Sequence, residues 1–181
     1  MLLDTPLCAF GWTPPALTLP DTDGQPHRLA VPEGARALLV AFICNHCPYV
    51  KAIIDRLVAD ARLLEQDGVA VLAVMSNDFD AYPEDSPARM RQFAAAHGMG
   101  FPYLVDAEQV AARAYGAVCT PDFFGFNAAG QLQYRGRLDD AGIKPQPRRH
   151  GELLDAMRQI AASGQGPREQ HPSMGCSIKW R

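Results

Sequence analysis

The chain has 181 residues, of which 48% are hydrophobic, and it carries a formal net charge of −3. This length and apolar content suit one domain, residues 1–181, in which we expect a core at about 10–165 and a C-terminal tail at 166–181. The slight negative charge excludes a strong attraction to nucleic acid, so we expect no nucleic-acid partner.

The sequence also argues against membrane insertion and against a disulfide-stapled secreted domain. No stretch approaches the roughly 20 consecutive apolar residues of a membrane span, and residues 1–20 lack the basic start and apolar run of a secretory leader. The five cysteines are unevenly spaced in a long chain, which favours reactive thiols over a structural framework. We therefore expect a cytoplasmic protein with no membrane partner.

The first predicted elements lead to a pair of cysteines. Residues 16–29 alternate around an Asp/Gly turn, which predicts a short N-terminal β-hairpin. Residues 37–43 form a continuous apolar run, typical of a strand buried on both faces of a largely parallel sheet. Apolar residues from Val50 to Leu64 then recur at three- and four-residue steps, which predicts an amphipathic helix beginning near Pro48.

The middle of the chain continues the alternation of strands and helices. Residues 69–74 predict a second buried strand, and Ser86-Pro87 predicts the start of a helix that ends at Gly98. Residues 101–105 predict a third strand.

The last third predicts a short helix, a hairpin and a final helix. Asp106 and Gln109 have the spacing of a capping box, so we expect a helix to begin there and to end at Gly116. Residues 123–126 and 132–136 predict a hairpin, and residues 153–161 predict the last helix. The order of elements indicates an α/β fold with a central mixed β-sheet flanked by helices.

The motif Cys44-Asn45-His46-Cys47 stands between the first buried strand and its helix. This position predicts both sulfurs in the first helical turn, close enough to form a disulfide. A helix N-terminus stabilises a thiolate, and we expect Cys44, predicted to be the more exposed, to gain most and to act as the nucleophile. Cys47 is then the resolving thiol, and His46 adds positive charge that favours the thiolate and a more oxidising couple.

The same motif is consistent with two simpler roles. The cysteines are either ordinary buried thiols at a strand end or two ligands of a zinc site. Zinc sites of this type usually need four ligands, and no second closely spaced Cys/His pair follows in the chain. We therefore expect neither a bound metal nor another cofactor.

The segment from Phe42 to Val50, the order of elements and Thr120-Pro121 together resemble the thioredoxin superfamily. The resemblance is greatest to its peroxiredoxin-like branch of AhpC/TSA-related redoxins, over roughly residues 10–181. It implies a thioredoxin-like fold in which Pro121 is a cis-proline that faces the cysteines and binds the incoming thiol or peptide. A plain trans proline that opens the following strand is the alternative.

Other residues enter the candidate site through this resemblance. Asn45 and Thr120 are expected to line it. Arg137, Asp139 and Asp140 belong to a segment that also resembles this branch, and they either line the mouth of the site or form a solvated hairpin end.

Two further cysteines each allow two roles. Cys176, in the C-terminal segment that resembles the same branch, is either a third redox thiol or an unreactive tail cysteine. Cys119 either faces the disulfide or packs as a small apolar side chain.

The chain departs at two points from the motifs of related proteins, once from that of thioredoxins and once from that of peroxiredoxins. Thioredoxins carry an acidic residue in the strand before the cysteines, but residues 38–43 contain none, so we expect protons to move through His46 or water. Peroxiredoxins place a proline and a Thr or Ser ahead of the peroxidatic cysteine, and alignment on Cys47 puts Val40 and Cys44 there. This argues against a fast peroxidase, which needs positioned donors as well as a thiolate.

Three functions are consistent with these observations. The leading one is a thiol–disulfide oxidoreductase that acts on protein or small-molecule disulfides and thiols, with an electron donor that the sequence does not identify. The second is a peroxiredoxin-like thiol peroxidase with Cys176 as resolving thiol. The third is a non-enzymatic copper-binding or redox-sensing protein that uses Cys44, His46 and Cys47.

Overall fold

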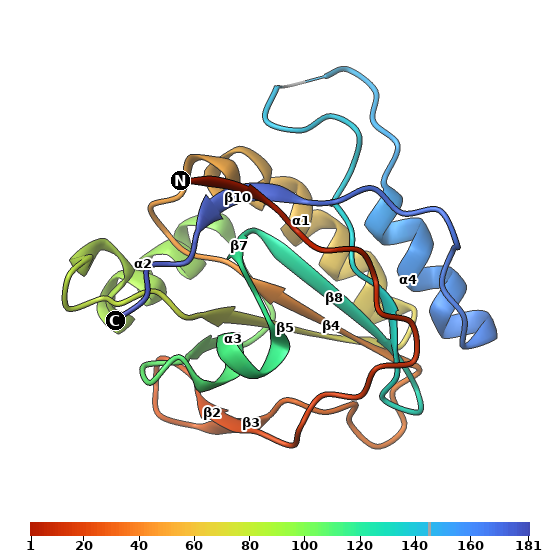
Figure 1. Ribbon diagram of the computed structural model, residues 1–181, viewed down its shortest axis with the longest axis horizontal. Coiled ribbons are helices and arrows are strands. Elements are labelled where there is room, and N and C mark those ends of the chain that lie inside the picture. Colours follow the sequence, from red (N-terminus) through yellow and green to blue (C-terminus); the bar gives the residue numbers. More distant parts are fainter. Residues whose placement is uncertain (145) are drawn as a thin grey trace.

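The computed structural model describes residues 1–144 and 146–181 (Figure 1). The helical elements are α1 Pro48–Gln66, the 3-10 turn η1 Pro83–Asp85, α2 Pro87–His97, α3 Val110–Tyr115 and α4 Glu152–Ser163. The strands are β1 Leu2–Asp4, β2 Thr18–Pro20, β3 Pro26–Arg28, β4 Ala37–Phe42, β5 Val69–Met75, β6 Tyr103–Val105, β7 Cys119–Thr120, β8 Asp122–Asn127, β9 Leu132–Tyr134 and β10 Met174–Ser177.

A five-stranded mixed sheet in the order β6-β5-β4-β8-β9 forms the centre of the fold. β4, β5 and β6 are parallel, whereas β8 pairs antiparallel with β4 and with β9. Helices α1 and α4 cover one face, and α3 with the β2–β3 hairpin covers the other (Figure 1). The predicted thioredoxin-like α/β fold, its central mixed sheet and its N-terminal hairpin are confirmed.

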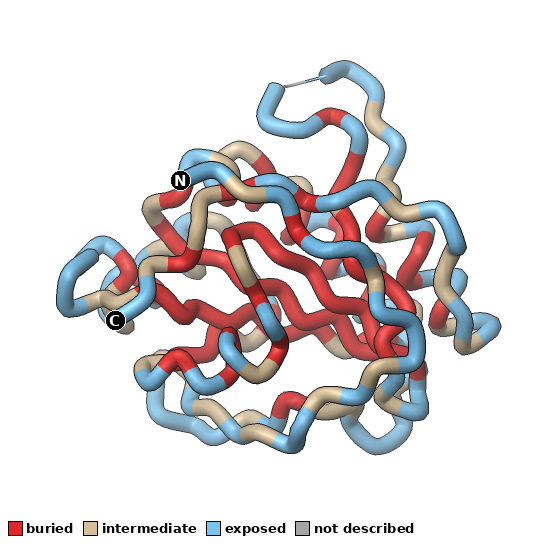
Figure 2. Tube along the Cα trace, in the orientation of Figure 1, coloured by how far each residue is buried: buried red, intermediate tan, exposed pale blue. Residues whose placement is uncertain are grey.

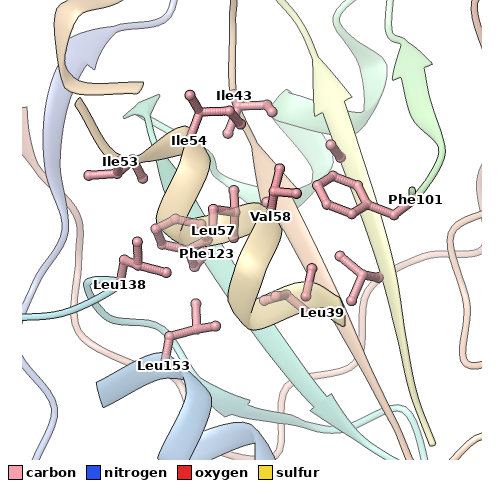
Figure 3. Packing of buried hydrophobic residues seen from close by; sticks show 14 of the residues in the cluster. Leu39, Ile43, Ile53, Ile54, Leu57, Val58, Phe101, Phe123, Leu138 and Leu153 are labelled. Carbon is pink, nitrogen blue, oxygen red and sulfur yellow. The ribbon is translucent and has the colours of Figure 1, made fainter. Parts of the chain in front are cut away.

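Burial on both faces explains the continuous apolar run of β4, because alternate side chains of a strand enter different cores. Leu39 lies in the core under α1, whereas Val40 lies in the core under α3. Figure 2 shows the central strands buried along their whole length. Figure 3 shows Leu57 of α1 beside Phe123 and Ile54 beside Ile43, all in one core cluster. Full burial of one such side chain contributes about 1.5–3 kcal/mol, so this packing holds the start of α1 firmly on the sheet.

The two ends of the chain meet in a second, small sheet. β10 lies between β1 and β7 in the order β1-β10-β7, and both pairings are antiparallel. Ile178, just after β10, is buried in the core on the α3 side. The predicted tail at 166–181 thus includes a strand that is docked beside the loop preceding β8. Within the part of the chain that the structure describes, no helix is both long and apolar enough to cross a membrane.

The predicted capping box at Asp106 and Gln109 is wrong, because α3 begins only at Val110. Gln109 has a left-handed backbone, with φ of 58°, and its side-chain amide donates to the carbonyl of Lys179 instead of reaching back to the helix. The Asp106 carboxylate still accepts the backbone N–H of Ala112 at 2.9 Å. The acid therefore caps α3 from a loop rather than from the N-cap position.

Candidate functional site

The cysteine motif forms the turn between β4 and α1, and the helix begins at Pro48. Cys47 is the N-cap residue, with an extended backbone, and Cys44 lies three residues before it. The expectation that both sulfurs sit in the first helical turn is therefore wrong, because proline occupies the first helical position. Both thiols are buried, with Cys44 1% and Cys47 0% exposed, so exposure does not distinguish them.

The protein favours a thiolate at Cys47 rather than at Cys44. The interaction with the Cys44 thiol lowers the pKa of Cys47 to about 4, with backbone N–H groups of Val50 and Cys176 assisting against burial. The same interaction raises the pKa of Cys44, as do burial and the nearby charge of Asp85. The expectation that Cys44 gains most from the helix is thus wrong. The reason is first the interaction of the two thiols, in which Cys44 keeps the proton, and then the backbone N–H groups of Val50 and Cys176, which favour negative charge on Cys47.

Thr120 and Pro121 face both cysteines. The Thr120–Pro121 bond is cis, as predicted. The Thr120 hydroxyl lies 3.3 Å from Cys44 Sγ, and the Thr120 carbonyl oxygen lies 3.3 Å from Cys47 Sγ and accepts from it whenever that thiol is protonated. The neighbouring Cys119 is fully buried, its Sγ lies 3.7 Å from the Pro121 carbonyl oxygen, and burial raises its pKa. Cys119 is therefore a buried thiol beside the cis-proline, and burial disfavours its thiolate.

Asp85 is a site residue that sequence reasoning missed. It ends η1 and is fully buried, and its carboxylate accepts from Asn45 N at 2.7 Å, His46 Nδ1 at 2.7 Å and Asn77 Nδ2 at 2.9 Å. Burial raises the pKa of Asp85, but these hydrogen bonds outweigh it and hold the pKa below the usual value. Nothing in a single sequence separates Asp85 from its exposed neighbour Glu84, because only the fold brings η1 against the cysteine turn.

His46 and Asn45 both contact η1 or the residue just before it. The hydrogen bond to Asp85 raises the pKa of His46, and the imidazole stacks on Tyr82 with 5.6 Å between ring centroids. Asn45 Nδ2 donates to the Glu84 carbonyl at 2.9 Å. The positive charge of His46 is therefore paired with Asp85, so the predicted stabilisation of a Cys44 thiolate is offset by the carboxylate.

One cluster of the described residues has the composition of a metal site. Cys44 Sγ, a His46 ring nitrogen and an Asp85 oxygen all lie within 4.8 Å of one another. Both carboxylate oxygens already accept short hydrogen bonds, including the backbone N–H of Asn45. An ion bound here would have to displace those bonds, so the geometry suits proton exchange better than metal binding.

Arg137 and Asp139 line a cavity of about 300 Å³ whose wall also includes Pro121 and Met174. Their charges are paired inside the protein. Arg137 forms three hydrogen bonds to Glu152, the shortest of them 2.6 Å long.

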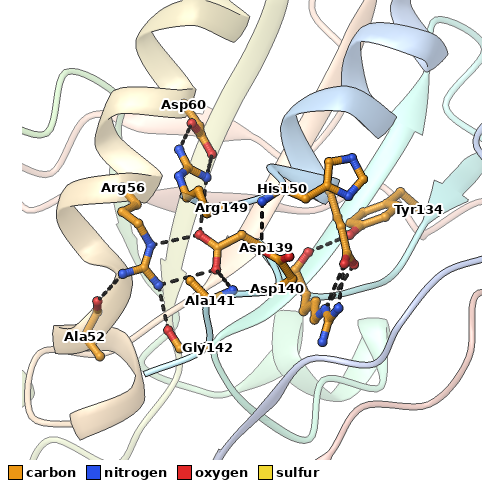
Figure 4. Close-up of polar contacts among 12 residues, drawn as sticks. Ala52, Arg56, Asp60, Tyr134, Asp139, Asp140, Ala141, Gly142, Arg149 and His150 are labelled. Atoms are coloured by element: carbon orange, nitrogen blue, oxygen red, sulfur yellow. Dashed lines mark hydrogen bonds and ion pairs between the residues drawn. The ribbon is translucent and has the colours of Figure 1, made fainter. Parts of the chain in front are cut away.

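Asp139 and Asp140 form hydrogen bonds with residues of the surrounding scaffold and not with the cysteines. Figure 4 shows Asp139 between Arg56, at 2.8 Å, and Arg149, at 3.3 Å. Asp140 accepts the backbone N–H of His150 at 2.7 Å and is exposed. The structure therefore brings the first residue of this pair to the cavity wall and leaves the second on the surface.

Cys176 lies on β10 directly opposite Thr120 in the antiparallel register. It is half-buried and packs against the core that contains Cys44 and Cys47. The structure thus gathers three of the five cysteines at one site, although Cys176 is separated from Cys47 by most of the sequence.

Comparisons with known proteins agree with this geometry. Residues 11–135 match the AhpC/TSA family. An uncharacterized conserved protein from Geobacillus kaustophilus is 39% identical, with a TM-score of 0.92 over 100% of this chain and 97% of its own. A hypothetical protein from Sinorhizobium meliloti 1021 is also 39% identical, with a TM-score of 0.91 over 98% of this chain and 97% of its own.

A more distant structure extends the likeness at the level of the fold alone. The thioredoxin domain of a thiol-disulfide oxidoreductase from Bacteroides vulgatus is 14% identical, with a TM-score of 0.65 over 84% of this chain and 98% of its own. No curated protein sequence matches the chain. The family match, the sheet topology and the three clustered thiols lead to one conclusion: the chain belongs to the AhpC/TSA family and is a redox protein of the thioredoxin fold.

Proposed function

We propose that the protein is a thiol–disulfide oxidoreductase that uses Cys44 and Cys47 as a dithiol–disulfide couple. The observation that carries this proposal is the pair of buried thiols at the N-terminus of α1, both of which lie 3.3 Å from an oxygen of Thr120. A sulfur held as thiolate beside a second thiol is the arrangement that thiol–disulfide exchange requires.

The reaction begins with Cys47, which replaces Cys44 as the attacking group in view of its lowered pKa. The Cys47 thiolate attacks a substrate disulfide, a mixed disulfide forms and the first substrate thiolate leaves. The Cys44 thiol then loses its proton and attacks Cys47 Sγ. The Cys44–Cys47 bond forms, and the second substrate thiolate leaves and takes up a proton. The reverse sequence oxidises a substrate dithiol.

Asp85 and His46 are the groups placed to take the proton from Cys44. A carboxylate oxygen of Asp85 and a ring nitrogen of His46 lie within 4.8 Å of each other and of Cys44 Sγ, a distance that one water molecule spans. β4 itself contains no carboxylate that could take this proton. In this proposal the pair replaces that missing acid from the opposite side of the cysteine turn.

A graded glutathione redox series tests the proposal. The full chain is equilibrated across the series, its thiols are trapped by alkylation, and every disulfide is mapped by mass spectrometry. We expect a reversible Cys44–Cys47 bond, whose midpoint gives the potential and hence the direction of net exchange. If this bond is absent at every potential, the oxidoreductase proposal fails.

A peroxidase function is the second candidate, because Cys47 is a low-pKa thiol at a helix N-terminus, where a peroxidatic cysteine also lies. Cys44 occupies the position of the expected Thr or Ser, so the donor that would polarise the O–O bond is changed to a thiol. Peroxide consumption by the reduced protein separates the two functions. Oxidation by peroxide that is faster than exchange with disulfides would favour the peroxidase.

A further inference from the structure

The C-terminal strand lies on the edge of β7, immediately beside the cysteines. In the register of β10 and β7, Cys176 is opposite Thr120 and Ser177 is opposite Cys119. The approach is so close that a Cβ atom on Gly175 would collide with the carbonyl oxygen of Thr120. Glycine is therefore required at the residue before Cys176, because any side chain there would push the strand away from the site.

Hydrogen bonds hold this strand on both sides of Cys176. Before it, the Ser173 hydroxyl donates to the Pro121 carbonyl at 2.8 Å. After it, the backbone N–H of Lys179 donates to Asn77 Oδ1 at 2.9 Å, and the Lys179 carbonyl accepts from Gln109 Nε2 at 2.8 Å. Cys176 therefore lies on a strand that is docked beside the site and not on a flexible tail.

The three clustered thiols differ in their access to solvent. Cys44 and Cys47 are 1% and 0% exposed, whereas Cys176 is half-buried. Both Cys47 and Cys176 are neighbours of Thr120. Cys47 Sγ lies beside the Thr120 carbonyl oxygen, and Cys176 is opposite Thr120 in the pairing of β10 with β7. Cys176 packs against the core cluster that contains Cys47, and each thiol shifts the pKa of the other. A molecule that approaches from solvent thus meets Cys176 before it meets the buried pair.

We propose that Cys176 is a third redox-active residue, which exchanges with Cys47 and carries the disulfide between the buried pair and thiols or disulfides in solvent. This inference rests on the proposed oxidoreductase function and adds the route by which the buried couple is reached. The substrates it implies are small or flexible thiols and disulfides that can contact Cys176 while β10 stays in place.

The relay step conserves atoms and electrons. In the oxidised protein, Cys176 loses its proton and attacks Cys47 Sγ, so the Cys44–Cys47 bond breaks, the Cys47–Cys176 bond forms, and Cys44 takes up a proton. A solvent thiol then attacks Cys176 Sγ, which forms a mixed disulfide and releases the Cys47 thiolate. A second thiol attacks the mixed disulfide and restores the Cys176 thiol. The balance is two solvent thiols oxidised to one disulfide and one protein disulfide reduced.

The electrostatics of the cluster favour the second exchange, in which a solvent thiol opens the Cys47–Cys176 bond. Burial raises the pKa of Cys176, and its interaction with Cys47 raises it further, whereas the pKa of Cys47 is lowered. A sulfur of low pKa is the better leaving group. Cleavage of a Cys47–Cys176 bond by a solvent thiol attacking Cys176 is therefore faster than the opposite cleavage.

The test replaces Cys44, so that no Cys44 thiol can attack and break a Cys47–Cys176 disulfide once it has formed. The variants Cys44→Ser and Cys44→Ala are oxidised with oxidised glutathione as full chains, and their disulfides are mapped by mass spectrometry. We expect a Cys47–Cys176 bond in both and its loss when Cys176→Ser is added. Cys8→Ser is the matched control, because Cys8 is half-buried like Cys176 but packs against the other core, and it leaves the bond unchanged.

A kinetic measurement on the otherwise intact protein completes the test. In Cys176→Ser we expect the Cys44–Cys47 bond to form, but its reduction by glutathione to be at least about tenfold slower, because the buried sulfurs then react only after local opening. If the Cys44–Cys47 bond forms in the wild type while neither Cys44 variant yields a Cys47–Cys176 bond, the relay is refuted and the proposed function stands. If the Cys44–Cys47 bond itself never forms, the proposed function fails first.

Discussion

Replacement of Asp85 by alanine removes a fully buried carboxylate that accepts three hydrogen bonds at the cysteine turn. The His46 side chain is 25% exposed and can turn to water, but the backbone N–H of Asn45 and the amide of Asn77 lose their partner inside the protein. A hydrogen bond to a charged group contributes about 1.5–3 kcal/mol, so two such bonds amount to roughly 3–6 kcal/mol. This is a large part of the roughly 5–15 kcal/mol by which a domain is stable.

The effect depends on pH in a direction that the pKa shifts fix. The pKa of His46 is raised above 6.5 in the folded protein, so its contribution to stability is complete below pH 6.5 and is lost as the pH rises through the folded pKa. The pKa of Asp85 is lowered below 3.8, so its contribution is complete above pH 3.8 and is lost as the pH falls through the folded pKa. The difference between wild type and variant is therefore greatest between these two values.

Urea denaturation from well below pH 3.8 to well above pH 6.5 measures the free energy of unfolding where the two contributions are lost as well as where both are complete. Asp85→Asn is the first comparison, because it keeps one oxygen for Asn45 N but presents an amide to the Asn77 amide, so we expect a loss intermediate between wild type and Asp85→Ala. Glu84→Gln is the matched control, since Glu84 is the exposed neighbour and only its backbone carbonyl is used. If Asp85→Ala loses less than about 1 kcal/mol, or if the loss does not vary with pH, the buried role of Asp85 is refuted.

Three further predictions concern the strand, the ion pair and the thiolate. Gly175→Ala drives a Cβ into the Thr120 carbonyl oxygen, so we expect about 1–3 kcal/mol of destabilisation and faster alkylation of Cys47; unchanged rates would contradict the docking of β10. Arg135→Met leaves the fully buried Asp122 without its 2.8 Å partner, so we expect a loss of about 3–5 kcal/mol, largely recovered by adding Asp122→Leu. The reduced protein should show thiolate ultraviolet absorbance that titrates near pH 4, and its absence at neutral pH would refute the lowered pKa of Cys47.

Local patterns were enough to predict most of the secondary structure. The apolar run of β4, the three- and four-residue stripe of α1 and the Ser86-Pro87 start of α2 act over a few neighbouring residues, and each predicted the correct element. The capping box failed because Gln109 bonds to Lys179, a residue far along the chain. A short-range rule carries no information about such a partner.

In the candidate site, too, the features that depend on adjacent residues were predicted, and those that depend on residues distant in the sequence were not. The position of Cys44 and Cys47 between a strand and a helix follows from adjacent residues, and so did the family resemblance. Which thiol is favoured as thiolate depended on the interaction of the two thiols and on the backbone N–H groups of Val50 and Cys176. Asp85 entered the site because β5 and the loop after it return beside the cysteines.

The sequence by itself therefore determined the type of fold, the family and the position of a cysteine pair between a strand and a helix, since these depend on periodicity and on contiguous motifs. The tertiary structure alone decided that Asp85 pairs with His46, that Asp139 serves the scaffold rather than the cysteines, and that Cys176 stands beside Cys47. The physical reason is that burial and electrostatic interaction depend on distance in space. Residues far apart in the chain come within that distance only when the sheet and its two edges have formed.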